Sequence, residues 1–164
     1  MTTTRSFDRL PEGEARAALA ACLDVPRFVD EVLAGRPYGE AAVLEAAAAA
    51  SAASLSDEEL EAALARHPRI GERAGAGHDA AQSSREQAGV DRSDAEVRQR
   101  LADGNRAYEA RFDRVFLIRA AGRGAPEILA ELERRLGNDD ATERAETVRQ
   151  LGEIMLLRLR QVED

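Results

Sequence analysis

A histidine at the end of a predicted helix is the first residue that could do chemistry. His67 follows an amphipathic stretch and precedes Pro68, which keeps the histidine backbone out of helical geometry. Imidazole is the one side chain that titrates near neutral pH without help from its surroundings, so it is the default acid–base group. A histidine at a helix C-terminus is also favoured simply by the helix dipole. Both interpretations of His67 therefore stay open at this point.

Three polar residues further along the chain share a spacing that could build a binding site. Ser83, Glu86 and Gln87 lie three and four residues apart, so on a helix they would share one face. Ser83-x-x-Glu86 also matches a capping box, whose two side chains bind free amides at a helix start. The start of a helix binds anions well. The motif therefore predicts a helix start, and a ligand site there is a second hypothesis that can hold together with the first.

Arg158 interrupts an apolar helical segment, Leu156-Leu157-Arg158-Leu159. Leu151 and Met155 fall on the same side of the predicted helix as Leu159. A guanidinium group that is partly buried there would need an anion or a carboxylate partner. The competing interpretation is a surface arginine near the C-terminus, where several other arginines occur.

The longest irregular stretch runs from His67 to Ala81, and a loop of this length inside a compact domain is often functional. His78 lies in it without a clear partner. Arg119 and Arg123 flank Gly122 in a turn-like region, and we expect both to be solvated.

Apolar periodicity predicts helices almost throughout the chain and no sheet. Capping boxes at Ser56-x-x-Glu59 and Ser93-x-x-Glu96 mark two helix starts, and Pro26 opens another helix. The expected helices cover approximately residues 12–23, 26–34, 39–53, 56–66, 93–111, 125–136 and 141–162, with helical character also near Ser83. The apolar run 115–120 is too short to assign to a strand or a helix. We expect an all-α fold of about seven or eight helices in one domain over residues 1–164.

Length and composition exclude several classes of protein. The 164 residues fit one domain, and the net charge of −8 disfavours nucleic acid and anionic membranes as partners. All 23 basic residues are arginine, so no lysine can serve a phosphate-binding loop or a Schiff base. One cysteine and two histidines exclude an intrachain disulfide and leave a structural zinc site short of ligands. With no signal peptide or membrane span in view, we expect a cytoplasmic protein.

Taken together, the motifs resemble a known family. His67-Pro68-Arg69-Ile70-Gly71, followed by Ser83-x-x-Glu86-Gln87-Ala88-Gly89, is similar to the two signature motifs of the 2-oxo-4-hydroxy-4-carboxy-5-ureidoimidazoline (OHCU) decarboxylase family. The resemblance continues through Asn105-x-x-Tyr108-x-x-x-Phe112, Phe116-Leu117-Ile118, Arg135-Leu136-x-Asn138, Glu143 and Ile154-x-x-x-Arg158-Leu159. It covers nearly the whole chain.

The resemblance implies an all-α, cofactor-free and usually homodimeric enzyme that forms (S)-allantoin at the end of urate oxidation. The implied catalytic residues are His67, Glu86 and Arg158. The implied substrate-binding residues are Pro68, Ser83 (with Ser84 as the alternative register), Gln87 and the backbone around Phe116, Ile118 and Ala120. No metal site is implied. Functional coupling to urate oxidase and hydroxyisourate hydrolase is a further expectation.

The implied chemistry needs few groups, because the substrate carboxylate sits on a carbon next to a ring C=N bond that can accept electrons. We expect His67 to handle the proton of the hydroxyl on that carbon and Glu86 to orient His67. Arg158 would bind the anionic substrate. Either His67 or a bound water delivers the final proton.

Other functions are compatible with the same residues. One alternative is a non-catalytic helical interaction module, in which His67, Glu86 and Arg158 would not converge. A second is a decarboxylase or hydratase of a related nitrogen-rich acid, with a different set of donors and acceptors in its pocket. A nucleic-acid-binding helical domain is disfavoured by the charge of −8.

Overall fold

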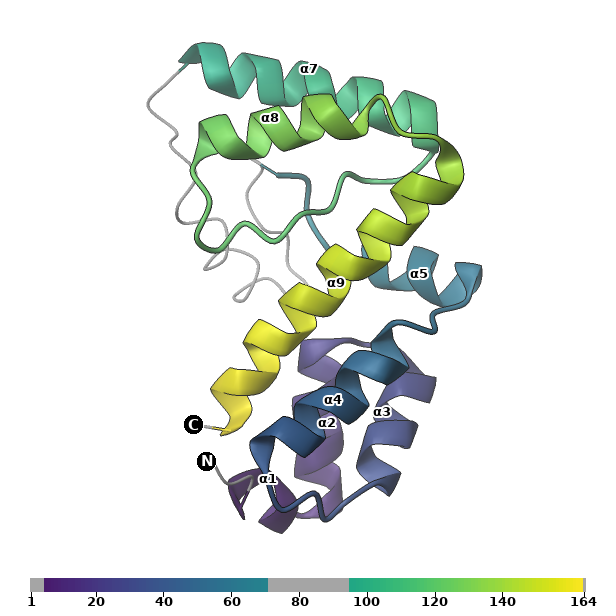
Figure 1. Cartoon of the computed structure of the whole chain (residues 1–164), viewed down its shortest axis with the longest axis vertical. Helices are drawn as coiled ribbons and strands as arrows, with labels where there is room; N and C mark the ends of the chain where they lie inside the picture. The colour runs from purple at the N-terminus through teal and green to yellow at the C-terminus, as the bar shows by residue number, and fades with distance from the viewer. Residues whose placement is uncertain (1–4, 71–94, 164) are drawn as a thin grey trace. The chain divides into compact units, whose positions relative to one another are not determined.

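The computed structural model describes residues 5–70 and 95–163, and in these ranges it contains helices and their connections but no strand. The helices are α1 (Arg5–Arg9), α2 (Glu12–Cys22), α3 (Pro26–Ala34), α4 (Ala41–Ala52), α5 (Asp57–Leu64), α7 (Ala95–Phe112), α8 (Ala125–Arg135) and α9 (Asp140–Glu163) (Figure 1). The all-α prediction is confirmed. None of the helices in these ranges combines the length and the apolar character that crossing a bilayer requires.

The chain divides into two compact units. One unit comprises Met1–Ala63 and Leu151–Asp164, and the other comprises Leu64–Gln150. Helix α9 contributes its first turns to the second unit and its remaining turns to the first. A single domain over residues 1–164 stays a prediction.

The unit that contains the N-terminal helices is built on apolar faces that the sequence pattern predicts. Helix α3 packs against both α2 and α4. The core positions of α2 and α3 are Ala15, Leu19, Cys22, Phe28, Val29, Val32 and Leu33, and all of them are buried. Alanine supplies most of α4, and its small side chain combines high helix propensity with close packing.

Side chains satisfy the helix ends in this unit. The backbone N–H of Ser56 donates to Glu59 Oε1 at 2.9 Å, and the Glu59 N–H donates to Ser56 Oγ at 3.1 Å. This is the predicted capping box at the start of α5. Arg27 donates to the carbonyls of Ser51 and Ser54 at 3.2 and 3.3 Å, so it caps the C-terminal end of α4.

The unit Leu64–Gln150 is organised around α7 and α8, which pack side by side (Figure 1). Its core comprises Ile70, Leu101, Tyr108, Phe112, Phe116, Ile118, Ala120, Ala125, Ile128, Leu129 and Leu132. Gly104 permits the close approach of the two helices, because a Cβ atom at this position would lie 2.6 Å from Leu132 Cδ2.

The connection between α7 and α8 is irregular. Residues 115–120 form neither helix nor strand, and positive φ angles occur at Asp113 (55°) and Gly122 (80°). Glycine adopts such an angle without steric cost, so the turn at Gly122 suits its residue type. Sequence periodicity did not predict the short helix α1, and the other boundaries agree within about two residues, the usual ambiguity of helix ends. The predicted helix start at Ser93 and the one near Ser83 lie outside the described residues.

Candidate active site

Of the nine predicted site residues, six lie in the described ranges. His67, Pro68, Phe116, Ile118 and Ala120 belong to the unit Leu64–Gln150, and Arg158 belongs to the other unit. Ser83, Glu86 and Gln87, together with Ser84 and His78, lie outside the described residues.

His67 occupies the turn that follows α5. The helix ends at Leu64, and the backbone N–H of His67 donates to the Leu64 carbonyl at 3.0 Å. The side chains of His67 and Pro68 are half-buried. The predicted placement of the histidine just beyond a helix end is therefore confirmed.

The residues after His67 are tied to α7. Arg69 Nε donates to both carboxylate oxygens of Glu109, at 2.8 and 3.0 Å. The buried Asn105 side chain donates to the Ile70 carbonyl at 3.1 Å, and the Ile70 side chain joins the core of the unit. The Asn105 bond thus holds the backbone at Ile70, three residues beyond His67, and the ion pair links the Arg69 side chain to α7.

Phe116, Ile118 and Ala120 pack their side chains into the same core as Ile70. Every second residue of this segment therefore packs into the core. Ile70, which follows His67 by three residues, and the segment 116–120 thus pack into one hydrophobic core. The expected role of this backbone in substrate binding stays a prediction.

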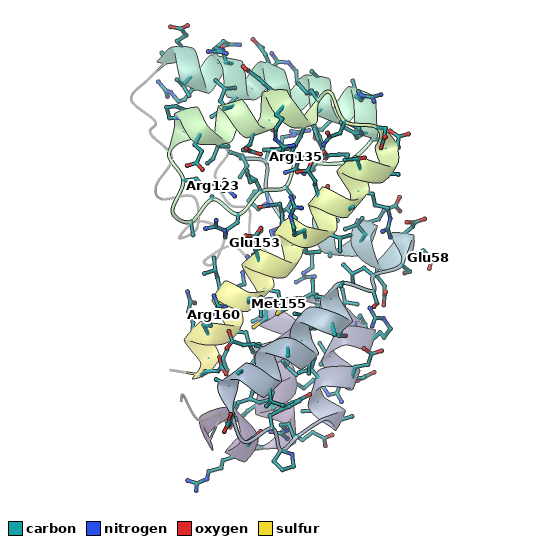
Figure 2. The ribbon with its side chains drawn as sticks, in the orientation of Figure 1. Glu58, Arg123, Arg135, Glu153, Met155 and Arg160 are labelled. Carbon is teal, nitrogen blue, oxygen red and sulfur yellow. The ribbon has the colours of Figure 1, made fainter. Side chains whose placement is uncertain are left out.

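A buried ion pair lies beneath this segment. Arg135 and Glu143 are each about fully buried, and Arg135 Nε donates to Glu143 Oε1 at 2.8 Å. Arg135 Nη1 donates to the Leu117 carbonyl at 2.8 Å, and the guanidinium carbon lies 4.6 Å from the Phe116 ring centroid. Figure 2 shows Arg135 at the end of α8, amid the side chains between α8 and the first turns of α9. One arginine thus contacts two consecutive residues of the segment.

Neighbouring polar groups complete the pair. The Tyr108 hydroxyl donates to Glu143 Oε1 at 2.6 Å, and Asn138 Nδ2 donates to Glu143 Oε2 at 3.0 Å. Thr147 Oγ1 accepts from Arg135 Nη2 at 3.2 Å. Burial, and then the bond to Glu143, raises the pKa of Tyr108 to about 12. The tyrosine is therefore a fixed donor at neutral pH.

The far end of the segment is held by a glutamine and two arginines. Gln150 Oε1 accepts from the Arg119 backbone N–H at 3.0 Å. Arg119 Nη1 donates to the Ala121 carbonyl at 2.6 Å, and Arg123 Nε donates to the Arg119 carbonyl at 2.9 Å. The prediction that Arg119 and Arg123 are simply solvated is wrong, because both are part-buried and close the turn around Gly122.

Arg158 is only 3% exposed, so of the two interpretations the buried guanidinium holds and the surface arginine does not. Its Nη1 donates to the Ala21 carbonyl in the last turn of α2 at 3.4 Å, at the negative end of that helix dipole. Leu151, Met155 and Leu159 are buried on the same helix, as predicted. Figure 2 labels Met155 and the exposed Arg160 on these last turns of α9.

Cys22 lies near Arg158 but is not poised to react. Burial raises the pKa of the Cys22 thiol to about 12; the positive charge of Arg158 opposes this shift and the negative charge of Glu163 adds to it. The thiol therefore stays protonated near neutral pH and is a weak nucleophile.

Sequence reasoning gave no role to the residues that hold these segments, although Asn105, Arg135 and Glu143 belong to the motifs that carry the family resemblance. Asn105, Arg135, Glu143 and Gln150 are buried polar side chains. The faces of α7 and α8 that carry Asn105 and Arg135 are otherwise mostly apolar, whereas Glu146 and Thr147 are buried beside Glu143 and Gln150 on α9. For Asn105 a signal was present in the sequence, because it lies four residues after Leu101 and three before Tyr108, the spacing of one helix face. A polar residue on an apolar face needs a buried partner, and that requirement could have marked it.

Within residues 5–70 and 95–163, no three His, Cys, Asp or Glu side chains are grouped to hold a metal ion. Cofactor-free chemistry stays a prediction.

Comparison with known proteins places the chain in a family. Residues 8–160 match the family model described as OHCU decarboxylase. A relative from Amia calva, 2-oxo-4-hydroxy-4-carboxy-5-ureidoimidazoline decarboxylase, is 32% identical over 140 residues, which cover 84% of this chain and 80% of the relative.

Solved structures agree in fold. A crystal structure of OHCU decarboxylase in the presence of (S)-allantoin has a TM-score of 0.71 at 22% identity, covering 87% of this chain and 94% of that chain. A crystal structure of (S)-allantoin synthase has a TM-score of 0.74 at 16% identity, covering all of this chain and 54% of the other. With a family model that spans nearly its whole length and a relative above 30% identity, this chain belongs to the OHCU decarboxylase family.

Proposed function

We propose that this chain decarboxylates OHCU to (S)-allantoin, the last step of urate oxidation, without a metal or cofactor. The observation that carries the proposal is that this chain, whose residues 8–160 match the OHCU decarboxylase family, packs Ile70, three residues after His67, into one core with Phe116, Ile118 and Ala120. The segment that carries the proposed acid–base group, His67, and the segment whose backbone would contact the substrate are thus attached to the same core. Such a pairing suits a small, polar, anionic substrate.

Decarboxylation requires an electron sink, a group that accepts the electron pair left behind when carbon dioxide departs. The bond between the ring carbon and its carboxylate breaks, carbon dioxide leaves, and the electron pair moves into the neighbouring C=N bond. The nitrogen of the former C=N bond gains a proton, and the hydroxyl loses its proton as the carbon that lost carbon dioxide becomes a carbonyl. A proton is added to one face of the neighbouring ureido-bearing carbon, which gives a single enantiomer. The substrate itself supplies the sink, so the protein must orient the carboxylate and manage protons.

We propose that His67 handles the proton of the hydroxyl on the reacting carbon. Glu86 would orient this imidazole, and its negative charge would favour the protonated form. Arg158 would bind the anionic substrate through charge-assisted hydrogen bonds. Either His67 or a bound water supplies the final proton.

Pro68, Ser83 or Ser84, and Gln87 complete the proposed substrate contacts, with backbone groups of Phe116, Ile118 and Ala120. We also propose a cytoplasmic homodimer that acts as a single domain, coupled in function to urate oxidase and hydroxyisourate hydrolase. Family resemblance supports each of these assignments.

The test follows the handedness of the product. Urate oxidase and hydroxyisourate hydrolase generate the unstable substrate from urate in situ, the protein is added, and circular dichroism is recorded. We expect rapid growth of the signal of one allantoin enantiomer. Racemic allantoin that forms at the spontaneous rate would refute the proposal and favour a non-catalytic interaction module or a different nitrogen-rich acid.

A further inference from the structure

The backbone of residues 116–120 has two side-chain attachments that the proposed chemistry does not itself require. Arg135 donates to the Leu117 carbonyl, and Gln150 accepts from the Arg119 amide, at 2.8 and 3.0 Å. The two attached residues flank Ile118 on either side. The attachments therefore fix the rotation of the backbone between them, and with it the directions in which the Ile118 N–H and C=O point.

The hydrogen bond from Arg135 requires the burial of a charged side chain, which costs desolvation free energy. Arg135 is 1% exposed, and it sits with Glu143 and Thr147 in a region that water does not reach. Replacing a buried ion pair by apolar residues is often neutral or stabilising, so stability alone is a weak reason for such a pair. Its fork of donors does what an apolar side chain cannot: it binds a carboxylate and a backbone carbonyl at the same time.

The second attachment comes from a different helix. Gln150 lies in the first half of α9 and is 7% exposed, while Arg135 ends α8. Arg123 adds a bond to the Arg119 carbonyl from the following turn, and Figure 2 shows it in the connection that leads to α8. Residues 116–120 lack the regular backbone hydrogen bonds of a helix or a sheet. These side chains therefore bond the backbone groups of the segment instead.

We propose that Arg135 and Gln150 are positioning residues that fix residues 116–120 as the substrate-facing wall of the site. The inference rests on the proposed function, because it assigns a purpose to the wall. It adds that these two side chains set the orientation of the Ile118 N–H and C=O groups. Neither residue needs to touch the substrate.

Gln150 gives the cleaner test, because Arg135 also belongs to the buried ion pair and its loss could unfold the unit. Gln150→Met removes the acceptor at similar volume, and Gln150→Glu restores an acceptor oxygen. Ser51→Ala is the matched control: Ser51 is also 7% exposed, and its hydroxyl bonds Glu31 and Arg27 rather than the segment.

Two measurements are made on the full-length protein. Hydrogen exchange at the Arg119 amide should accelerate in Gln150→Met and stay slow in Gln150→Glu and Ser51→Ala. Formation of (S)-allantoin should show kcat/KM reduced about ten- to a hundredfold in Gln150→Met, because small misplacements of site groups cost rate. Gln150→Glu should recover most of that loss, and Ser51→Ala should keep the wild-type value.

The outcomes separate the two proposals. Equal kcat/KM for Gln150→Met and Gln150→Glu, in an active wild-type background, would overturn the positioning role and leave the proposed function intact. An unchanged exchange rate of the Arg119 amide in Gln150→Met would overturn it as well. A wild-type protein without activity would refute the proposed function first.

Discussion

At the scale of single residues, residue type predicted which chemistry a side chain could do, and apolar spacing predicted which positions are buried. Neither predicted which groups a side chain would contact in the folded protein. His67 lies just past a helix end, as the sequence predicts, and Arg158 lies on a buried helix face, which is one of the two interpretations that the sequence left open. The Arg158 bond to the Ala21 carbonyl joins residues 137 positions apart. No local pattern encodes a contact across that separation.

The proposed role of Arg158 predicts a specific kinetic defect. Arg158→Gln should raise KM for OHCU about tenfold or more, since a hydrogen bond to a charged group contributes roughly 1.5–3 kcal/mol. Arg160→Gln is the matched control, because Arg160 lies two residues on and pairs with Glu45 at an exposed position. Steady-state kinetics would decide. Equal KM values for the two variants would remove Arg158 from substrate binding.

Tyr108 should titrate far above its ordinary range. The chain has two tyrosines and no tryptophan, so in Tyr38→Phe the near-ultraviolet tyrosinate absorbance reports Tyr108 alone. We expect a midpoint at about pH 12 in the folded protein. Because the folded pKa exceeds the unfolded value of about 10, the stability that Tyr108 contributes is complete below that pH and is lost as the pH rises toward 12. A midpoint near 10 in the folded protein would show that Tyr108 is not buried against Glu143.

At the scale of elements, the helices were predictable because apolar spacing, capping boxes, proline and glycine all act locally. The capping box at Ser56 and Glu59 forms as predicted. The connection 113–124 was not predictable, since its conformation depends on Arg135 of α8 and Gln150 of α9 as well as on its own Arg119 and Arg123. Helix α1 is one turn long and carries too few residues to show a period.

The packing of α7 against α8 leads to a prediction that helix propensity alone would get wrong. Gly104→Ala should destabilise the fold, because the new Cβ would lie 2.6 Å from Leu132 Cδ2 and overpacking costs about 1–3 kcal/mol. Gly152→Ala, on α9 with no described atom within 4 Å of its Cβ position, should stabilise by about 0.5–1 kcal/mol. Urea unfolding of the two variants beside wild type gives the free energies of unfolding. Stabilisation by Gly104→Ala would contradict the close approach of the two helices.

At the scale of the whole molecule, fold class and family were accessible from the sequence. The helical periodicity and the ordered motifs agree with the family match over residues 8–160. Composition narrowed the mechanism further, because a chain with 23 arginines and no lysine cannot use an amine nucleophile from a side chain. The buried Arg135–Glu143 pair could not be anticipated, since its partners come together only in the folded unit.

The measurement that tests the central claim most directly compares the two histidines of the chain. His67→Asn and His78→Asn make the same substitution at the only two histidine positions, and the initial rate of (S)-allantoin formation is followed by circular dichroism. We predict that His67→Asn lowers the rate about 10²–10⁴-fold with folding intact, as expected for loss of one acid–base group. We predict the wild-type rate for His78→Asn. A folded His67→Asn variant with the wild-type rate would contradict the account.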